Sequence, residues 1–398
     1  MPRLYAQEQL HLTFFRSLND IQSPEVPQSV WFPVKHGPGT TSVCPTAKRT
    51  NCNVALRRKP RRGYQSAYSF DADLGYHPRW MQDIPDEVLL SSLSIPGTHD
   101  TMSYSIPSDF LRCQNLDLST QLNSGIRYFD IRARLRDNEL HIYHAHIPTG
   151  FSFASVLTTM FEFLTTNPSE TIIMRLKEEG GPMGRSNTVK FVDAFNHHRH
   201  ADPRTAAGAA KHFFNYVQDA PLPMLGDLRS KIFIIQQFPD EHGLHGLKWR
   251  SKQMVLQDYW ITPSLFHLAD KWSVMRDAIE LAAAAEHDNS VLYLAHASTA
   301  VGVLPIDAAA GTANRTITGM NDMTGQWIEH LENIPEATRT GIVVFDFPGR
   351  RLVESVLRWN EPLKSVASKG QWLSEVWAKL YNWQSPISYT STISNKSS

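Results

Sequence analysis

The chain has 398 residues, with 39 Lys or Arg against 39 Asp or Glu, so its formal net charge is zero and favours no nucleic-acid partner. Apolar residues make up 41% of the chain, which is typical of a globular protein. No run of 18 apolar residues occurs, which excludes a transmembrane helix. The three cysteines, Cys44, Cys52 and Cys113, form no disulfide framework, although Cys44 and Cys52 could pair across a short loop.

The first residues do not read as a signal peptide. Polar side chains interrupt the apolar positions of MPRLYAQEQLHLTFF, so no continuous hydrophobic region forms. We therefore expect a cytoplasmic or peripheral membrane protein and a monomer, with secretion as the open alternative.

Residues 1–72 are predicted to be an N-terminal extension, disordered in part. Segment 22–46 is rich in Pro, Ser, Thr and Gly and shows no period. A basic cluster follows at 48–62, and residues 1–70 carry ten Lys or Arg against three Asp or Glu. Three interpretations stay open for this cluster: contact with an anionic membrane surface, a nuclear-localisation signal, and a solvated arm.

Residues 73–360 alternate between strand and helix patterns. Alternation of this kind predicts an α/β fold with a mostly parallel sheet. The expected strands are 91–95, 126–134, 140–144, 171–177, 231–237, 253–257, 291–296 and 341–346, and the expected helices are 153–166, 187–198, 206–219, 265–286, 322–332 and 351–359. Eight strands indicate a TIM-type barrel. Only about five residues connect the second strand to the third, too few for a crossover helix, so we expect a distorted, incomplete barrel.

Residues 361–398 are predicted to form a C-terminal helix and tail. Trp372, Val376, Leu380 and Trp383 share one helical face. We expect this helix to pack on the barrel, and an interfacial helix with its aromatic rings at the lipid headgroups is the alternative.

Ionisable residues follow many of the predicted strands, at the end where barrel enzymes place their active sites. They are His99, Asp100, Arg132, Arg134, His144, Lys177, Asp258, His296 and Asp346. Asp130, Arg132 and Arg134 occupy alternate positions of one strand and so share a face. Burying such charges costs several kcal/mol each unless they are paired. The cluster therefore indicates either an anion-binding site or a structural ion pair.

Four motifs in this region resemble the phosphatidylinositol-specific phospholipases C, and the bacterial type more than the calcium-dependent eukaryotic type. The motifs are Ile95-Pro96-Gly97-Thr98-His99-Asp100, Phe129-Asp130-Ile131-Arg132-Ala133-Arg134, Tyr143-His144, and Asn167-Pro168-Ser169-Glu170-Thr171-Ile172-Ile173-Met174. Four ordered motifs are a specific signal, whereas any one of them is weak. In the second half the resemblance rests on Val255–Asp258 and Gly341–Pro348.

The resemblance implies a role for each residue in cleaving an inositol phospholipid to diacylglycerol and an inositol cyclic phosphate. His99 would be the general base, oriented by Asp346. His144 would be the general acid, supported by Asp100. Arg132 would contact the phosphate. Lys177 and Asp258 would bind the inositol hydroxyls, and we place Arg134 with them. The substrate is expected to be an inositol phospholipid or a glycosylated inositol lipid.

Arg132 indicates whether the chain needs a metal ion. The calcium-dependent relatives have an acidic residue at this position, whereas a guanidinium supplies fixed positive charge and repels a cation. We therefore expect no metal and no cofactor. Two positions depart from the bacterial pattern: Gln236-Gln237 stand where the family has a further arginine, and Tyr259-Trp260 change the arrangement after Asp258.

Three other functions compete with this one. A metal site at residues 196–200, Asn-His-His-Arg-His, is disfavoured by the arginine within it. A magnesium-dependent glycerophosphodiester-type barrel would need carboxylates at Arg132. The alternative from another class is a catalytically weak barrel that binds inositol lipids or serves as an interaction module.

Overall fold

One mostly parallel sheet organises the part of the chain that the structure, a computed structural model, describes: residues 66–69, 75–240, 243, 245–299 and 301–365. Its strand order is β7-β6-β5-β2-β1-β10-β9-β8, and every neighbouring pair along that path is parallel. The strands are β1 (Ile95–Thr98), β2 (Tyr128–Arg136), β3 (Glu139–His144), β4 (Ile147–Ser152), β5 (Ile172–Glu178), β6 (Ile232–Gln237), β7 (Leu247–Lys248), β8 (Met254–Gln257), β9 (Leu292–His296) and β10 (Ile342–Phe345).

Continuous apolar runs explain why these segments form the centre of the sheet. A parallel strand is covered on both faces and therefore carries apolar residues without alternation. All four residues of β10 are buried, and so are the first five residues of β5 and of β6. In β6 and β8 the polar residues Gln236, Gln237 and Gln257 stand at the carboxyl end of the strand.

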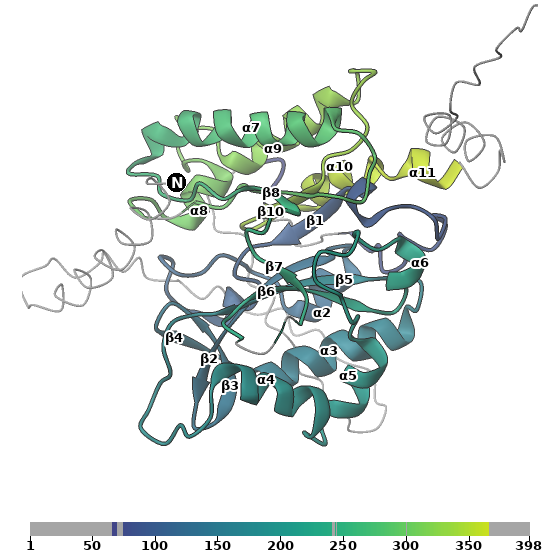
Figure 1. Cartoon of the computed structure of the whole chain (residues 1–398). Coiled ribbons are helices and arrows are strands. Elements are labelled where there is room, and N and C mark those ends of the chain that lie inside the picture. Colours follow the sequence, from purple (N-terminus) through teal and green to yellow (C-terminus); the bar gives the residue numbers. More distant parts are fainter. Residues whose placement is uncertain (1–65, 70–74, 241–242, 244, 300, 366–398) are drawn as a thin grey trace, which may run out of the picture. The chain divides into compact units, whose positions relative to one another are not determined.

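Helices cover the outside of the sheet. They are α2 (Leu118–Asn123), α3 (Phe153–Thr166), α4 (Phe191–His200), α5 (Ala206–His212), α6 (Leu225–Leu228), α7 (Leu268–Ala284), α8 (Pro305–Ala310), α9 (Met320–Leu331), α10 (Arg350–Arg358) and α11 (Glu361–Ser365), with 3-10 turns η1 (Leu90–Ser92), η2 (Ser103–Ser105) and η3 (Leu265–His267). Figure 1 shows α3, α4 and α5 on the side of β2 and β3, and α7, α9 and α10 on the side of β8, β10 and β1.

The irregularity expected between the second and third strands is present. β2 and β3 form an antiparallel hairpin, and β4 extends it by a second antiparallel pairing. The connecting residues Asp137 and Asn138 have φ of 54° and 63°. Two successive positive φ values are the conformation that joins strands through a two-residue hairpin turn. No crossover helix is needed here, because the chain reverses direction.

The predicted first strand is wrong in position. Residues 91–95 were expected, but Leu90–Ser92 form a 3-10 turn and the strand is Ile95–Thr98. The sequence prediction also missed β4 and β7, which contain Pro and Gly or are only two residues long. The helix expected at 206–219 ends at His212. The other predicted strands and long helices agree with the structure within a few residues.

The prediction of a distorted, incomplete TIM-type barrel is confirmed. The path of paired strands begins at β7 and ends at β8, and no pairing between the described residues closes it. Because the strands of the path run parallel, their carboxyl ends meet at one end of the barrel, where barrel enzymes carry their active sites. In the described part of the chain, no helix is both long and apolar enough to cross a membrane.

The packed core reaches slightly beyond the predicted barrel boundary at residue 73. Tyr68 is buried among residues of α9 and α10, and Ser69 pairs with Pro348. The basic cluster at 48–62, Cys44, Cys52 and the amphipathic segment after residue 365 lie outside the described residues.

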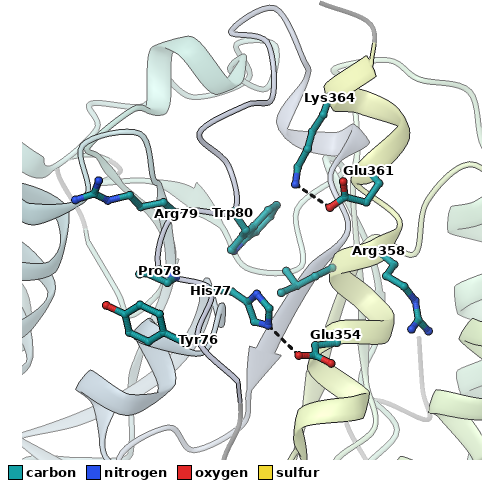
Figure 2. A pocket seen from close by; sticks show the side chains of 10 residues that line it. Tyr76, His77, Pro78, Arg79, Trp80, Glu354, Arg358, Glu361 and Lys364 are labelled. Carbon is teal, nitrogen blue, oxygen red and sulfur yellow. Dashed lines mark hydrogen bonds and ion pairs between the residues drawn. The ribbon is translucent and has the colours of Figure 1, made fainter.

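A pocket of about 470 Å³ lies at the amino-terminal end of the strands. Figure 2 shows His77 facing Glu354 of α10, and Lys364 facing Glu361 of α11. Trp80 donates from its indole nitrogen to the carbonyl of Gly125, which precedes β2. The pocket is therefore at the opposite end of the barrel from the strand ends that carry the predicted site residues.

Candidate active site

Most of the predicted site residues gather at the carboxyl ends of the strands. His99 and Asp100 directly follow β1, and Asp346 directly follows β10. β1 pairs with both β10 and β2, which places these residues beside Arg132 of β2. His144 is the last residue of β3, Lys177 is the second-last residue of β5, and Asp258 follows β8. The parallel sheet thus brings together residues that are up to 247 positions apart in the sequence.

His99 and Asp346 form the first contact of the site. His99 Nδ1 lies 2.8 Å from Asp346 Oδ1, and both side chains are largely buried. Burial, together with the positive charge of Arg132, lowers the pKa of His99 well below its usual value. Burial, together with Asp100, raises the pKa of Asp346. Both shifts disfavour the charged forms, so burial favours a neutral imidazole and a neutral carboxyl group in this pair.

Asp100 connects both histidines to Arg132. Its Oδ2 lies 3.1 Å from His99 Nε2 and 3.2 Å from His144 Nε2, and its Oδ1 lies 3.0 Å from Arg132 Nε. The backbone of Asp100 has a φ of 41°, an uncommon conformation for a residue with a side chain. Its N–H donates to Asp130 Oδ2 at 3.2 Å, which helps to hold this sharp turn after β1.

A backbone carbonyl fixes the proton on Nδ1 of His144. Its Nδ1 lies 2.6 Å from the carbonyl oxygen of Leu111, so Nδ1 must be the donor. The other nitrogen, Nε2, then faces Asp100. A proton on Nε2 would lie between His144 and the carboxylate, where it is available for transfer. The centroids of the two histidine rings are 6.5 Å apart.

Arg132 is the most heavily paired cation of the site. It donates to Asp130 Oδ2 at 2.9 and 2.8 Å, and its terminal nitrogen lies 3.5 Å from Glu179 Oε1. Burial alone would lower its pKa, but Asp100 and Asp130 outweigh burial and raise it well above the usual value. Arg132 therefore stays charged, and its guanidinium is held rigidly beside the two histidines.

The three predicted substrate-binding residues differ in their surroundings. Lys177 Nζ lies 2.7 Å from Glu179 Oε2. Asp258 lies 3.5 Å from a terminal nitrogen of Arg250, and its pKa is lowered although burial opposes the shift, because His296 and Arg175 attract the charged form. Arg134 lies outside this set of paired charges: it donates to the carbonyls of Gly181 and Ala145 and so joins two loops at the rim.

Arg175 of β5 was missed by the sequence reasoning. Its guanidinium donates to Gln237 Oε1 through two nitrogens, lies 3.3 Å from Asp130 Oδ1, and stacks 3.8 Å from the ring centroid of Trp249. A positive charge therefore stands beside Gln237, where the sequence indicated the loss of one. The signal was available, because residues 175, 177 and 179 alternate as 130, 132 and 134 do.

Lys271 and His296 lie behind the histidines and were also not assigned a role. Lys271 of α7 is fully buried and donates to the carbonyls of Tyr259 and His296, which fixes the ends of β8 and β9. Burial lowers its pKa to about 7. The ring of His296 lies 6.2 Å from His99 and 6.1 Å from Trp249, and burial lowers its pKa to about 4.

The run of histidines at 196–200 contributes one residue to a group with metal-ligand spacing, made of Glu139, His198 and Asp202. His198 Nδ1 lies 3.0 Å from Asp202, but Arg204 donates to both Asp202 and Glu139. A guanidinium already supplies the positive charge that these carboxylates need. The arrangement therefore fits a structural ion pair better than a metal centre.

Comparison with known proteins agrees with this geometry. The family described as "Phosphatidylinositol-specific phospholipase C, X domain" matches residues 93–238. The 1-phosphatidylinositol phosphodiesterase of Listeria monocytogenes is 30% identical over 298 residues, which cover 71% of this chain and 85% of that protein. The protein of the same name from Staphylococcus aureus strain Newman is 29% identical over 146 residues, 35% of this chain and 46% of that protein.

Solved structures give the same fold. The phosphatidylinositol-specific phospholipase C from Listeria monocytogenes superposes with a TM-score of 0.57 and 30% identity, covering 72% of this chain and all of that one. A variant of the Staphylococcus aureus enzyme has the same TM-score at 19% identity and supports the fold alone. With matched motifs, a shared barrel and a relative aligned over most of its length, the chain belongs to the phosphatidylinositol-specific phospholipase C family.

Proposed function

We propose that this chain cleaves an inositol phospholipid by metal-independent intramolecular phosphoryl transfer. The observation that carries the proposal is the linked set Asp346–His99–Asp100–His144, with Arg132 on the same carboxylate. It contains an imidazole oriented by a carboxyl group, a second imidazole, and a fixed positive charge. Phosphodiester cleavage needs these three groups.

In the first step, His99 Nε2 would take the proton of the inositol 2-hydroxyl as that oxygen attacks phosphorus. The bond from phosphorus to the diacylglycerol oxygen would break, and His144 would deliver its Nε2 proton to that leaving oxygen. Arg132 would stabilise the charge on the phosphoryl oxygens. The products would be diacylglycerol and an inositol cyclic phosphate, with Lys177, Asp258 and Arg134 contacting the headgroup.

Positive charge at the site supports an anionic substrate without help from a metal. Arg132, Arg175 and Lys177 converge on this end of the barrel, and Arg132 occupies the position beside Asp100 that a cation would need. We therefore propose that turnover persists when divalent ions are removed.

We propose further that the mouth of the barrel contacts an anionic membrane surface. Large apolar side chains stand exposed in the loops after β1 and β8: Phe110 is 71% exposed and Phe266 86% exposed. Phe110 is next to Leu111, whose carbonyl holds His144. Aromatic side chains of this kind partition into the headgroup region of a bilayer. One of the Staphylococcus aureus structures concerns that enzyme's membrane binding.

Phosphorus NMR of the full chain with phosphatidylinositol vesicles and excess EDTA tests the reaction. We expect a cyclic inositol phosphate signal that is lost in His99→Ala and in His144→Ala. His330→Ala is the control, because His330 is an exposed histidine in the last turn of α9 and is not part of this linked set.

Turnover that appears only after calcium or magnesium is added would refute the metal-independent mechanism. Vesicle binding without product under any condition would instead favour a binding or interaction module on the same barrel. Parallel assays on a glycosylated inositol lipid distinguish the two expected substrate classes.

A further inference from the structure

The pocket of about 470 Å³ at the amino-terminal end of the strands has no part in the proposed reaction. Residues 76–80 form one of its walls, and α10 and α11 form the other (Figure 2). Trp80 and Leu357 are mostly buried and lie at its floor, whereas Tyr76 is 74% exposed at its edge. The pocket therefore combines an exposed aromatic ring with an apolar floor.

Polar contacts hold the two walls of this pocket in place. His77 Nε2 lies 3.1 Å from Glu354 Oε1, which links the 76–80 segment to α10. Arg79 Nε donates to Asn167 Oδ1 at 3.0 Å, which ties the same segment to the end of α3. The pocket is thus preformed, and an occupant would not have to order its walls on binding.

The described part of the chain ends beside this pocket. α11 ends at Ser365, and two of its residues, Glu361 and Lys364, line the pocket. Residues 366–398 follow and lie outside the described part. The six residues 366–371 can span about 20 Å when extended, and Gly370 among them permits a sharp change of direction. The segment that begins at residue 372 is therefore within reach of the pocket.

The sequence of that segment suits the pocket. Residues 372–383 read Trp-Leu-Ser-Glu-Val-Trp-Ala-Lys-Leu-Tyr-Asn-Trp, with an aromatic and aliphatic helical face and no net charge. Three Lys or Arg and two Glu line the pocket. The N-terminal extension is a poorer match, because residues 1–70 carry ten Lys or Arg against three Asp or Glu and would meet a like charge.

We propose that residues 372–383 dock in this pocket, with their tryptophans against Tyr76 and Leu357. Burial of large apolar side chains drives such docking, and contacts between aromatic rings add to it. The pocket is at the opposite end of the barrel from Phe110 and Phe266, so the docked segment would face away from the proposed membrane contact. The inference selects packing on the barrel over an interfacial helix, and it does not rest on the proposed function.

Photo-cross-linking in the full chain tests the contact. The photoreactive residue p-benzoylphenylalanine is placed at Tyr76, and tryptic peptides are identified by mass spectrometry after irradiation. We expect an intramolecular cross-link to peptide 370–379 that is lost in Trp372→Ser/Trp377→Ser. The matched control carries the same photoreactive residue at Val217, which is 70% exposed at a different pocket, and should give no cross-link to that peptide.

Urea unfolding gives a second, independent measurement. Tyr76→Ser should lower the urea midpoint of the otherwise wild-type chain. That decrease should disappear when Trp372→Ser/Trp377→Ser is already present, because both changes remove the same contact. Val217→Ser, in contrast, should have the same effect with and without the two tryptophan substitutions.

Three results would overturn the docking. A cross-link from position 76 to residues 1–65 or to a second copy of the chain would give the pocket another occupant. Additive effects of Tyr76→Ser and Trp372→Ser/Trp377→Ser on the urea midpoint would show that these side chains do not touch. Weaker vesicle binding of Trp372→Ser/Trp377→Ser, with the cross-link at position 76 absent in the wild type, would assign the segment to the lipid interface.

Discussion

Asp346 is the residue on which the orientation of His99 depends. Its carboxylate contacts His99 Nδ1, and its backbone carbonyl accepts from Asn321 Nδ2 at 2.9 Å, so strand end and side chain are both fixed. Asp346→Asn keeps the size but replaces the acceptor by an amide that can present N–H to His99. We expect kcat to fall about 10²- to 10⁴-fold, as when the orienting carboxylate of a catalytic histidine is lost.

Steady-state turnover on vesicles, together with binding of the variant to vesicles that carry a non-cleavable lipid, checks this effect. Vesicle binding should be unchanged, because Asp346 is behind His99. A variant with full kcat and weak binding would show that Asp346 serves the headgroup instead.

Arg175 supports Arg132 through a shared carboxylate. Asp130 is 1% exposed, and its two oxygens face Arg132 and Arg175. Burial would raise the pKa of Asp130, but the two arginines outweigh burial and lower it. Arg175→Met removes half of this compensation from a buried charge, which typically costs about 3–5 kcal/mol.

Urea unfolding measures the effect of Arg175→Met on the free energy of unfolding. The matched control is Arg136→Met in β2, because Arg136 pairs with Asp137 at the exposed surface. An exposed pair of this kind is screened by solvent and contributes little to stability. Equal losses in the two variants would contradict a structural role for the Arg175–Asp130 pair.

Sequence reasoning found the residues that follow a motif and missed those that only the fold brings together. His99 and Asp100 directly follow a short apolar run, and Arg132 alternates with Asp130 on one face of another. The structure places His99, Asp100 and Arg132 in contact. The same alternation put Arg134 on that face, but β2 continues beyond the rim, so Arg134 binds loop carbonyls instead. Trp249, Lys271 and His296 meet the site across strands and a helix, and no local pattern encodes those distances.

At the scale of elements, the first strand shows why its position was hard to predict. β1 contains Pro96 and Gly97, which usually interrupt a strand. A side chain at Gly97 would place its Cβ 2.8 Å from Cδ1 of the buried Tyr128. The glycine is there because β1 and β2 approach closely, and this approach brings His99 and Asp100 to Arg132. A local rule therefore failed where the site requires a tertiary contact.

The loops after β1 and β8 carry the proposed membrane contact. Phe266 is 86% exposed in η3, which follows β8 at the active-site end. Phe266→Ser should weaken binding to phosphatidylinositol vesicles by roughly 2 kcal/mol, the transfer free energy of one such side chain. Turnover of a short-chain lipid below its micelle concentration should stay unchanged.

Leu281→Ser is the matched control for this prediction. Leu281 is 53% exposed and lies in the last turn of α7. This end of α7 leads to the amino-terminal end of β9, away from the active-site end of the strands. A vesicle sedimentation assay compares the two variants. Equal weakening in both would mean that the exposed side chains of these loops do not define the membrane surface.

At the scale of the whole molecule, the site depends on both halves of the barrel. The X-domain match covers 93–238 and contains His99, Arg132 and His144, but Asp258 and Asp346 lie beyond it. β10 returns to pair with β1, and this single pairing delivers Asp346 to His99. A strand pairing formed late in the sequence thus joins His99, the first catalytic candidate, to Asp346, the last.

The pH dependence of global stability follows from the buried His296. Burial lowers its pKa from 6.5 to about 4 in the folded chain. Between these two values the unfolded chain binds a proton that the folded chain does not, so the free energy of unfolding falls as pH drops from about 6.5 to about 4. Below pH 4 both states are protonated, and His296 causes no further loss. At pH 4.5 the loss relative to pH 7 should be about 2–3 kcal/mol.

His296→Gln isolates this contribution, because the other buried histidines and carboxylates remain in both proteins and cancel in the difference. Urea unfolding at pH 7, 5.5 and 4.5 should show the wild type losing its advantage over His296→Gln as pH falls. The absolute stability of the variant also reflects lost packing against Trp249 and Tyr128, so only the change of the difference with pH is informative. A difference that stays constant would mean that the folded chain protonates His296 as readily as the unfolded chain does.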